Sequence, residues 1–325
     1  MQSVVATGAD VGGSSKRSLV RKPRLVEGAL ELMVKLVALT AIASILLILV
    51  FVGKEALPLF TSAEVHREVT PASLFAATAA GHIWQPVAEH PKYDILPLLA
   101  GSLKVTLISL VLAVPLSVGA AIFVAEYAPR RARELLKPAI ELLAGVPSVV
   151  IGFFALVVLA GWVQRVFGTA TRLNALVAGI GLSFAICPIV FTIAEDALRA
   201  VPGSYRTAAT ALGSTPSQTL VRVILPAAVP GIAAAIVLGF GRAVGETMIV
   251  LLASGNAALF DANVGHSTRT ITATIAAELG EVVVGSPHYH VLFALGALLF
   301  IATFGVNFIG ERIVAGMRRR LTGTS

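Results

Sequence analysis

Six long apolar runs dominate this chain of 325 residues and restrict the folds open to it. A bilayer core about 30 Å thick is crossed by roughly 20 helical residues at about 1.5 Å each, and every run approaches or exceeds that length. The runs predict membrane-spanning helices over residues 33–51, 96–124, 139–163, 173–193, 232–253 and 291–313. Only 13% of the residues are charged, whereas soluble domains carry about 25%. The sequence therefore predicts an all-α polytopic membrane protein and excludes a soluble enzyme, a disordered chain and a β-barrel of short alternating segments.

The 25 Lys and Arg residues are distributed unevenly between the segments that connect these runs. Seventeen lie in residues 16–35, 130–137, 199–222 and 312–320, and only six lie in the alternate segments. Because Lys and Arg accumulate in cytoplasmic segments of membrane proteins, both termini are predicted to be cytoplasmic. Topology then accounts for the net charge of +7, and nucleic-acid binding is not needed to explain it.

The connecting segments also predict how the chain is divided. Residues 1–30, rich in Gly, Ser, Lys and Arg, are expected to form a disordered basic cytoplasmic tail, and residues 31–325 the transmembrane domain. Two external segments cover about 53–95 and 254–290. The first apolar run follows a basic tail and lacks a small-residue cleavage site, so it is expected to be a retained anchor. Trp84 is interpreted as an aromatic anchor at the outer membrane interface.

The cytoplasmic segment at about 195–229 contains residues that start and end helices. Residues 207–212 are predicted to form a short Ala-rich helix ending at Gly213, because glycine readily adopts the left-handed conformation found at helix ends. Thr215 and Gln218 have the spacing of a capping box for a second helix, which Pro226 is expected to stop. The product is two helices joined by a sharp turn, with a smooth surface that suits a groove of another protein.

This segment resembles the signature of the inner-membrane permease subunits of ABC importers, which reads Glu-Ala-Ala, three residues, Gly, nine residues, Ile, one residue, Leu-Pro. The spacing is intact, although Thr207 replaces the usual Glu and Val223 the usual Ile. The matching residues are Thr207, Ala208, Ala209, Gly213, Val223, Leu225 and Pro226. The resemblance implies cytoplasmic coupling helices that contact a separate ATPase, with one charge missing from that contact at Thr207.

Other segments resemble the phosphate-specific branch of that family, and the PstC family more than its sister, the PstA family. They are Trp84-Gln85-Pro86, Leu96-Pro97-Leu98-Leu99, Gly101-Ser102-Leu103, Ala125-Glu126-Tyr127, the residues from Gly145 to Val150, and those from Gly241 to Met248. The resemblance implies a multi-pass protein of the bacterial inner membrane that forms a heterodimer with a second permease. It also implies a homodimeric ATPase, which would bind ATP and Mg, and an external phosphate-binding protein. No cofactor or metal is expected on this chain.

Charged residues inside a span cost about 2.5 to 3.5 kcal/mol on insertion scales, so they usually face protein or water. Arg242 and Glu246 are four residues apart and are predicted to share a helix face as an ion pair. A guanidinium group matches the geometry of phosphate oxygens, so Arg242 is a candidate substrate contact, with Glu246 orienting it. Thr247 and Ser148 are the other candidate pathway residues, the latter beside a proline bend. A purely structural Arg242–Glu246 pair is the alternative.

Two other functions compete with phosphate import. The same arginine chemistry suits sulfate, molybdate or another oxyanion. An intramembrane enzyme is disfavoured because no histidine lies within a predicted span and Cys187 is the only cysteine.

The sequence contains no Gly-x-x-x-x-Gly-Lys-[Ser/Thr] loop, so ATP is not expected to bind this chain by that route. His288 and His290 are interpreted as solvated loop histidines without a nearby carboxylate cluster.

Overall fold

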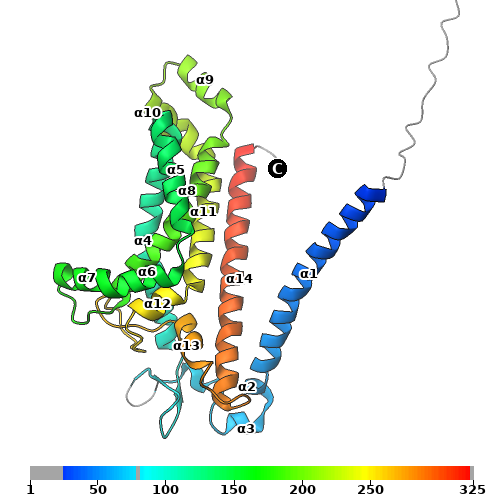
Figure 1. Cartoon of the computed structure of the whole chain (residues 1–325), viewed down its shortest axis with the longest axis vertical. Coiled ribbons are helices and arrows are strands. Elements are labelled where there is room, and N and C mark those ends of the chain that lie inside the picture. The colour runs from blue at the N-terminus through cyan, green and yellow to red at the C-terminus, as the bar shows by residue number, and fades with distance from the viewer. Residues whose placement is uncertain (1–24, 78–80, 323–325) are drawn as a thin grey trace, which may run out of the picture. The chain divides into compact units, whose positions relative to one another are not determined.

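The computed structural model describes residues 25–77 and 81–322 and is predominantly helical (Figure 1). The chain divides after Val50 into two compact units, and each is described by itself. The first unit contains most of α1 (Leu25–Ala56), a largely apolar helix of 32 residues whose charged residues lie toward its two ends. Of the predicted basic tail, residues 1–24 lie outside the described residues, whereas residues 25–30 already belong to α1.

The second unit begins with short elements. These are α2 (Pro58–Thr61), α3 (Ala63–His66), the 3₁₀ turn η1 (Ser73–Phe75) and the antiparallel strands β1 (Trp84–Gln85) and β2 (Lys92–Tyr93). Longer helices and three π-helical turns follow. They are α4 (Leu96–Ile122), η2 (Phe123–Tyr127), α5 (Arg130–Ala144), α6 (Ser148–Phe154), η3 (Ala155–Leu159), α7 (Ala160–Phe167), α8 (Ala175–Arg199), α9 (Gly203–Ala211), α10 (Pro216–Thr219), η4 (Leu220–Ile224), α11 (Leu225–Gly245), α12 (Met248–Ala253), α13 (Ile271–Glu278) and α14 (Pro287–Thr322).

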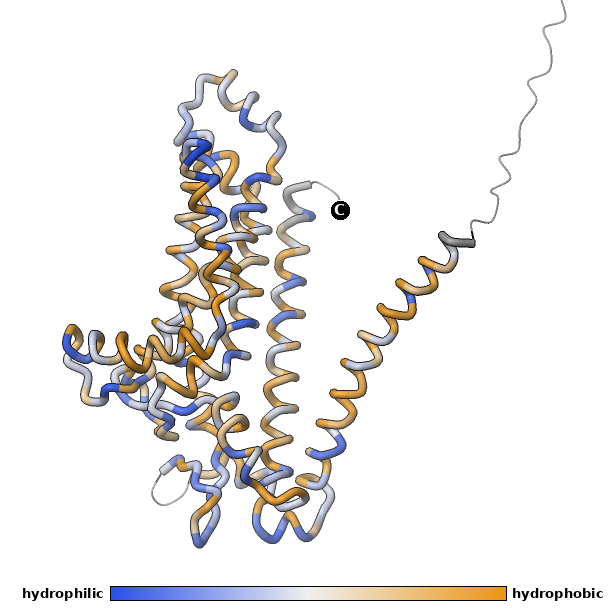
Figure 2. The backbone as a smooth tube through the Cα atoms, viewed as in Figure 1, coloured by the Kyte–Doolittle hydropathy of each residue, from blue (hydrophilic) through white to orange (hydrophobic). Residues whose placement is uncertain are grey.

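Six helical segments of the described chain are long and apolar enough to cross a membrane, which confirms the predicted number. They are Gly28–Thr61, Leu96–Tyr127, Ser148–Phe167, Ala175–Arg199, Pro216–Gly245 and Pro287–Met317. Figure 2 shows the corresponding apolar stretches along α4, α8, α11 and α14 in the second unit.

The predicted third span, 139–163, is wrong at its start. Pro147 has an extended ψ of 136° and no N–H group, so helix α5 stops before it and α6 begins at Ser148. Residues 139–144 therefore belong to the amphipathic helix α5, and the apolar span starts at Ser148.

The predicted fifth span, 232–253, is wrong at both ends. Helix α11 ends at Gly245, because Glu246 is extended with a ψ of 131°, and the short helix α12 follows. At the other end Pro226 does not stop a helix. The π-helical turn η4 joins α10 to α11, with the Leu225 N–H bonded to the carbonyl five residues back. Pro226 follows this wider turn as the second residue of α11. Its missing N–H group therefore does not end the helix there.

Close helix packing forms the core of the second unit around α8. A Cβ atom on Gly179 of α8 would lie 2.4 Å from the Ile108 side chain of α4. A Cβ on Gly239 of α11 would lie 2.8 Å from the Val190 side chain of α8. These glycines let three long helices approach closely. Because lipid tails are as apolar as the side chains, the hydrophobic effect does not drive helices together in a membrane, and close packing at small residues does.

The segment around Trp84 folds onto α13 and α14 and does not form a membrane anchor. Trp84 is only 4% exposed, and its indole N–H donates to the Glu278 carboxylate at 3.2 Å. Its ring lies edge-on to Tyr93 across the hairpin, with ring centroids 5.8 Å apart. The interpretation of Trp84 as an interfacial anchor is therefore wrong, because its ring is buried within the chain and its polar edge is directed to the partly buried Glu278 carboxylate.

Candidate functional site

The predicted coupling turn is built as the sequence indicates. Gly213 has a φ of +77°, and the N–H groups of Gly213 and Ser214 bond to the carbonyls of Thr210 and Ala209 at 3.0 and 3.1 Å. This pair of bonds is a Schellman motif, which satisfies the last carbonyls of α9. The Thr215 and Gln218 capping box is also present, with reciprocal bonds of 3.0 and 3.3 Å.

Most of the short helix α9 is exposed, as a docking element requires. Thr207 and Ala208 are exposed, whereas Ala209 is buried against the chain itself. The Thr207 hydroxyl donates to the Gly203 carbonyl at 2.8 Å, so it is occupied within its own helix. Leu212, at the end of α9, is 88% exposed and is the most prominent apolar side chain of this loop. Leu225 and Pro226 lie at the start of α11 and not on the exposed turn.

The candidate pathway residues meet where α11 ends and α12 begins. Arg242 Nη2 lies 3.9 Å from Glu246 Oε2, which is a loose contact, and the Arg242 side chain is 48% exposed. The Glu246 side chain is 6% exposed, and its Oε1 accepts hydrogen bonds from the N–H groups of Met248 and Ile249 at 3.2 and 3.5 Å. Glu246 thus holds the start of α12, and Arg242 keeps most of its five N–H donors available.

Helix α13 contributes to this region, which the sequence interpretation missed. The Thr272 hydroxyl donates to the Glu246 backbone carbonyl at 2.9 Å, and Thr270 caps α13 through the Ala273 N–H. Thr247 and Thr272 line an open groove of about 460 Å³ together with Ile275, Ala276, Leu279 and Gly280. The groove shows that α13, predicted only as part of an external loop, lies beside the Arg242 region.

Asn307 is a second residue that the sequence interpretation missed. Its carboxamide lies on α14 beside Gly241, where a Cβ would be 3.3 Å from Asn307 Oδ1. The side chain is exposed although it belongs to an apolar span, and Arg242 is the next residue of α11. The sequence did offer a signal for Asn307, because a polar residue within an apolar span usually faces protein or water and so marks a candidate site.

Ser148 is not joined to this group. It is the first residue of α6, whose Gly152 packs against α12, where a Cβ would lie 3.1 Å from the Ile249 Cα atom. Ser148 does not line the groove that contains Thr247 and Thr272. The structure therefore brings Arg242, Glu246 and Thr247 together. Ser148 lies outside this group, on helix α6, which packs against α12.

The two histidines of the predicted external loop are partnered and partly buried, which corrects their interpretation as solvated. His288 Nε2 lies 3.2 Å from Glu278 Oε2, and Arg269 pairs with the other oxygen of Glu278 at 2.7 Å. His290 Nδ1 lies 2.7 Å from the Glu55 carbonyl. The partner of His288, the Glu278 carboxylate, was not visible from sequence because ten residues separate the two.

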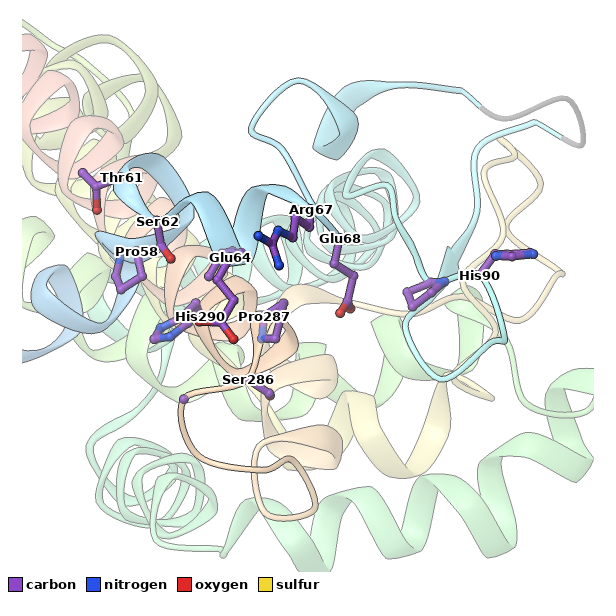
Figure 3. Close-up of a pocket in the computed structure, with 13 residues that line it drawn as sticks. Pro58, Thr61, Ser62, Glu64, Arg67, Glu68, His90, Ser286, Pro287 and His290 are labelled. Atoms are coloured by element: carbon purple, nitrogen blue, oxygen red, sulfur yellow. The ribbon is translucent and has the colours of Figure 1, made fainter.

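A polar cavity of about 890 Å³ opens near His290, as Figure 3 shows. Its charged lining comes from Glu64, Arg67 and Glu68 on and after α3, and from His90 of the hairpin turn. Glu68 also accepts the Tyr93 hydroxyl; burial first, and then this carboxylate, raise the pKa of Tyr93 above its ordinary value. The cavity draws none of its lining from α11, α12 or α13, so it is separate from the Arg242 region.

A second external group ties α4 to the loop after α12. Lys104 Nζ donates to Asp261 at 3.2 Å, and His266 Nδ1 lies 2.8 Å from the other Asp261 oxygen. Partial burial favours the neutral acid, but the hydrogen bonds from His266 and Lys104 outweigh it and hold the pKa of Asp261 below its ordinary value. We call Lys104, Asp261 and His266 the external clip. Among the described residues, no group of three or more His, Cys, Asp or Glu could hold a metal ion.

Comparison with known proteins decides the family. The model of binding-protein-dependent transport system inner membrane components matches residues 114–323. The chain belongs to this family of ABC transporter permeases. The permease is 35% identical to the probable ABC transporter permease protein YqgH of Bacillus subtilis, over 82% of this chain and 84% of that protein. It is 34% identical to the phosphate transport system permease protein PstC of Mesorhizobium japonicum, over 82% and 85% of the two chains.

Solved structures share the fold of this permease. A chain of the bacterial alginate ABC transporter matches with a TM-score of 0.58 at 14% sequence identity, covering 87% of this chain and 95% of that one. A chain of the MetNI methionine ABC transporter matches with a TM-score of 0.51 at 18% identity, covering 69% and 94%. At these identities the likeness concerns the fold alone, which is that of an ABC importer permease subunit.

Proposed function

We propose that this permease is the PstC-type subunit of an ATP-driven phosphate importer and forms half of its translocation pathway. The observation that carries the proposal is the exposed, loosely paired Arg242 at the end of α11, in a chain that aligns with PstC permeases over most of its length. An oxyanion crossing an apolar barrier needs exchangeable N–H donors with positive charge, and guanidinium supplies a planar fork of them. Thr247 and Thr272 place hydroxyl groups along the adjoining groove.

The roles of Arg242 and Glu246 differ in this proposal. Glu246 is already bonded to two N–H groups and keeps the break between α11 and α12, while Arg242 contacts the substrate transiently. A loose pair at 3.9 Å neutralises Arg242 in part without occupying its donors, so the anion is bound weakly enough to leave.

The partners follow from the same proposal. A second permease, of the PstA type, completes the pathway, and a homodimeric ATPase binds ATP and Mg and contacts the α9 turn. An external phosphate-binding protein delivers the substrate. This chain hydrolyses no ATP itself and carries no cofactor. Both termini lie in the cytoplasm of the bacterium, so a reporter fused after Arg320 is expected to be cytoplasmic and one at Arg269 external; a cytoplasmic reporter at Arg269 contradicts this topology.

The test is uptake by the reconstituted four-component complex. Radiolabelled phosphate uptake is expected to resist competition by unlabelled sulfate and molybdate, and competition by either would redirect the proposal to another oxyanion. Arg242→Gln should abolish uptake with normal assembly, and Arg242→Lys should impair it because the fork is lost. Glu246→Gln should retain most uptake, because its amide oxygen still accepts the N–H groups of α12. Uptake restored in the Arg242→Gln, Glu246→Gln double variant would show that the pair is only structural.

A further inference from the structure

Arg206 connects helix α9 to two other elements at the same time. Its Nη2 atom pairs with the Glu126 carboxylate in η2, immediately after α4. The same guanidinium donates to the carbonyls of Val201 and Leu198 at the end of α8, at 3.1 and 3.4 Å. The two side chains are 33% and 15% exposed, so solvent screens the pair only in part.

The attachment of α9 depends on this arginine because its apolar contacts are few. Ala209 is the one buried side chain within α9. The helix ends in the exposed turn at Gly213, and its outward side chains are free to meet a partner. Figure 1 shows α9 at the end of the second unit where α4, α5 and α8 also end or begin.

Other cations fasten the elements to which Arg206 attaches. Arg133 of α5 donates to the carbonyls of Val124 and Ala125 at 2.9 and 2.8 Å, which are the unpaired carbonyls of the turn η2. Lys137 of α5 donates to the buried Glu195 of α8 at 2.8 Å. The ends of α4, α5 and α8 are therefore joined by charge-assisted bonds, which are about twice as strong as neutral ones.

We propose that Arg206 and Glu126 form a latch that makes α9 move with α4 and α8 as one body. A displacement of α9 by the ATPase is then passed directly to the two helices that pack against α11, where Arg242 lies. The proposal rests on the function proposed above and adds to it the residues that transmit the coupling. Arg206 is a positioning residue here, since it contacts no substrate and acts through the helices that it joins.

The chain supplies a matched control for this pair. Arg130 and Glu134 are also an arginine and a glutamate in contact, at 3.0 Å, near the same end of the molecule. That pair lies within the single helix α5 and is 92% and 63% exposed, so it connects no two elements. Breaking it removes the same charges without freeing α9.

The experiment measures phosphate taken up per ATP hydrolysed by the reconstituted complex. Arg206→Gln and Glu126→Gln should each assemble and hydrolyse ATP, while uptake per ATP falls about fivefold or more, at the lower end of typical allosteric coupling. The exchange variant Arg206→Glu with Glu126→Arg should recover part of the loss, because it restores the ion pair but not the hydrogen bonds to the Val201 and Leu198 carbonyls. Arg130→Gln and Glu134→Gln should leave the ratio unchanged. An unchanged ratio in assembled Arg206→Gln and Glu126→Gln complexes would overturn the latch.

A cross-link keeps the proposal testable if the glutamine variants assemble poorly. Cysteines are placed at Glu126 and Arg206 in a Cys187→Ala background and joined with a bismaleimide. Movement as one body predicts that the cross-linked complex still transports, whereas transport abolished by the cross-link shows that the contact must open and overturns the proposal. Uptake per ATP hydrolysed, for the glutamine variants and for the cross-linked complex, can be measured with whichever oxyanion the unmodified complex carries. An error in the assigned substrate is therefore distinguishable from an error in the latch.

Discussion

The turn at Gly213 permits the sharpest test of how the coupling loop works. Gly213→Val puts a β-branched residue at a φ of +77°, a left-handed conformation that valine strongly disfavours. Apart from Gly213 and its immediate neighbours along the chain, no atom of the described residues lies within 4 Å of a Cβ atom built at this position. The substitution therefore strains the backbone but causes no collision within the permease itself.

The size of the effect follows from these two facts. A left-handed conformation costs an ordinary L-residue roughly 1–2 kcal/mol, and asparagine adopts it with less cost. Since each 1.4 kcal/mol corresponds to a factor of ten, the native turn of Gly213→Val should be about tenfold less favoured than that of the glycine protein. The Schellman bonds of Gly213 and Ser214 would be lost in the alternative conformations.

The assay is binding of the isolated ATPase to the permease heterodimer in detergent, together with the amount of permease inserted into membranes. ATPase affinity is expected to fall about tenfold in Gly213→Val and less than about threefold in Gly213→Asn, with equal insertion of both. Equal affinity of the valine and asparagine variants would refute the reasoning, because the left-handed turn would then not control docking. A fall in insertion for valine alone would refute it as well.

Three further predictions concern stability. Gly101→Ala should lower the thermal stability of the complex strongly, because its Cβ would lie 2.1 Å from the Arg269 backbone carbonyl oxygen, just before α13. The yield of assembled complex and its thermal unfolding measure this. Lys137→Met should lower the free energy of unfolding by about 1.5–3 kcal/mol, because the buried Glu195 loses one charge-assisted hydrogen bond and keeps its ion pair with Arg199, and Lys137→Arg should restore most of it. The lowered pKa of Asp261 means that the external clip adds stability at neutral pH and loses it only as pH falls below the ordinary value of 3.8. The protection of residues 261–266 against hydrogen exchange, taken relative to the intrinsic exchange rate at each pH, should therefore be equal at pH 5 and 7.

Local features of the fold were predictable from sequence because their causes are local. The capping box at Thr215 and the left-handed Gly213 depend on residues within one turn of each other. The number of spans follows from apolar length alone. Lys137 and Arg199 were assigned to segments predicted to be cytoplasmic, but their pairing with Glu195 was not visible from sequence. The hydrogen bond from Lys137, 58 residues away, to that buried carboxylate raises the pKa of the lysine.

Features that depend on distant segments were not predictable in this way. Trp84 was interpreted as an aromatic anchor at the outer membrane interface, yet its partner Glu278 lies 194 residues along the chain. Hydropathy averaged over a span also conceals a break of one or two residues, so the interruption at Glu246 was interpreted as continuous helix and Pro147 was predicted only as a bend within a span. Both interruptions are decided by the conformation of a single residue and not by composition.

The break at Glu246 changes what the Arg242–Glu246 spacing means. On an uninterrupted helix, residues four apart would form a close ion pair, and each charge would be used mainly to neutralise the other. Here the carboxylate turns to the N–H groups of Met248 and Ile249, and the Thr272 hydroxyl binds the carbonyl of the same residue. The acid is therefore buried with its own partners while the guanidinium stays exposed. One residue maintains the interruption in the backbone, and the other provides a positive group at that interruption, which is the separation of tasks that transient anion binding requires.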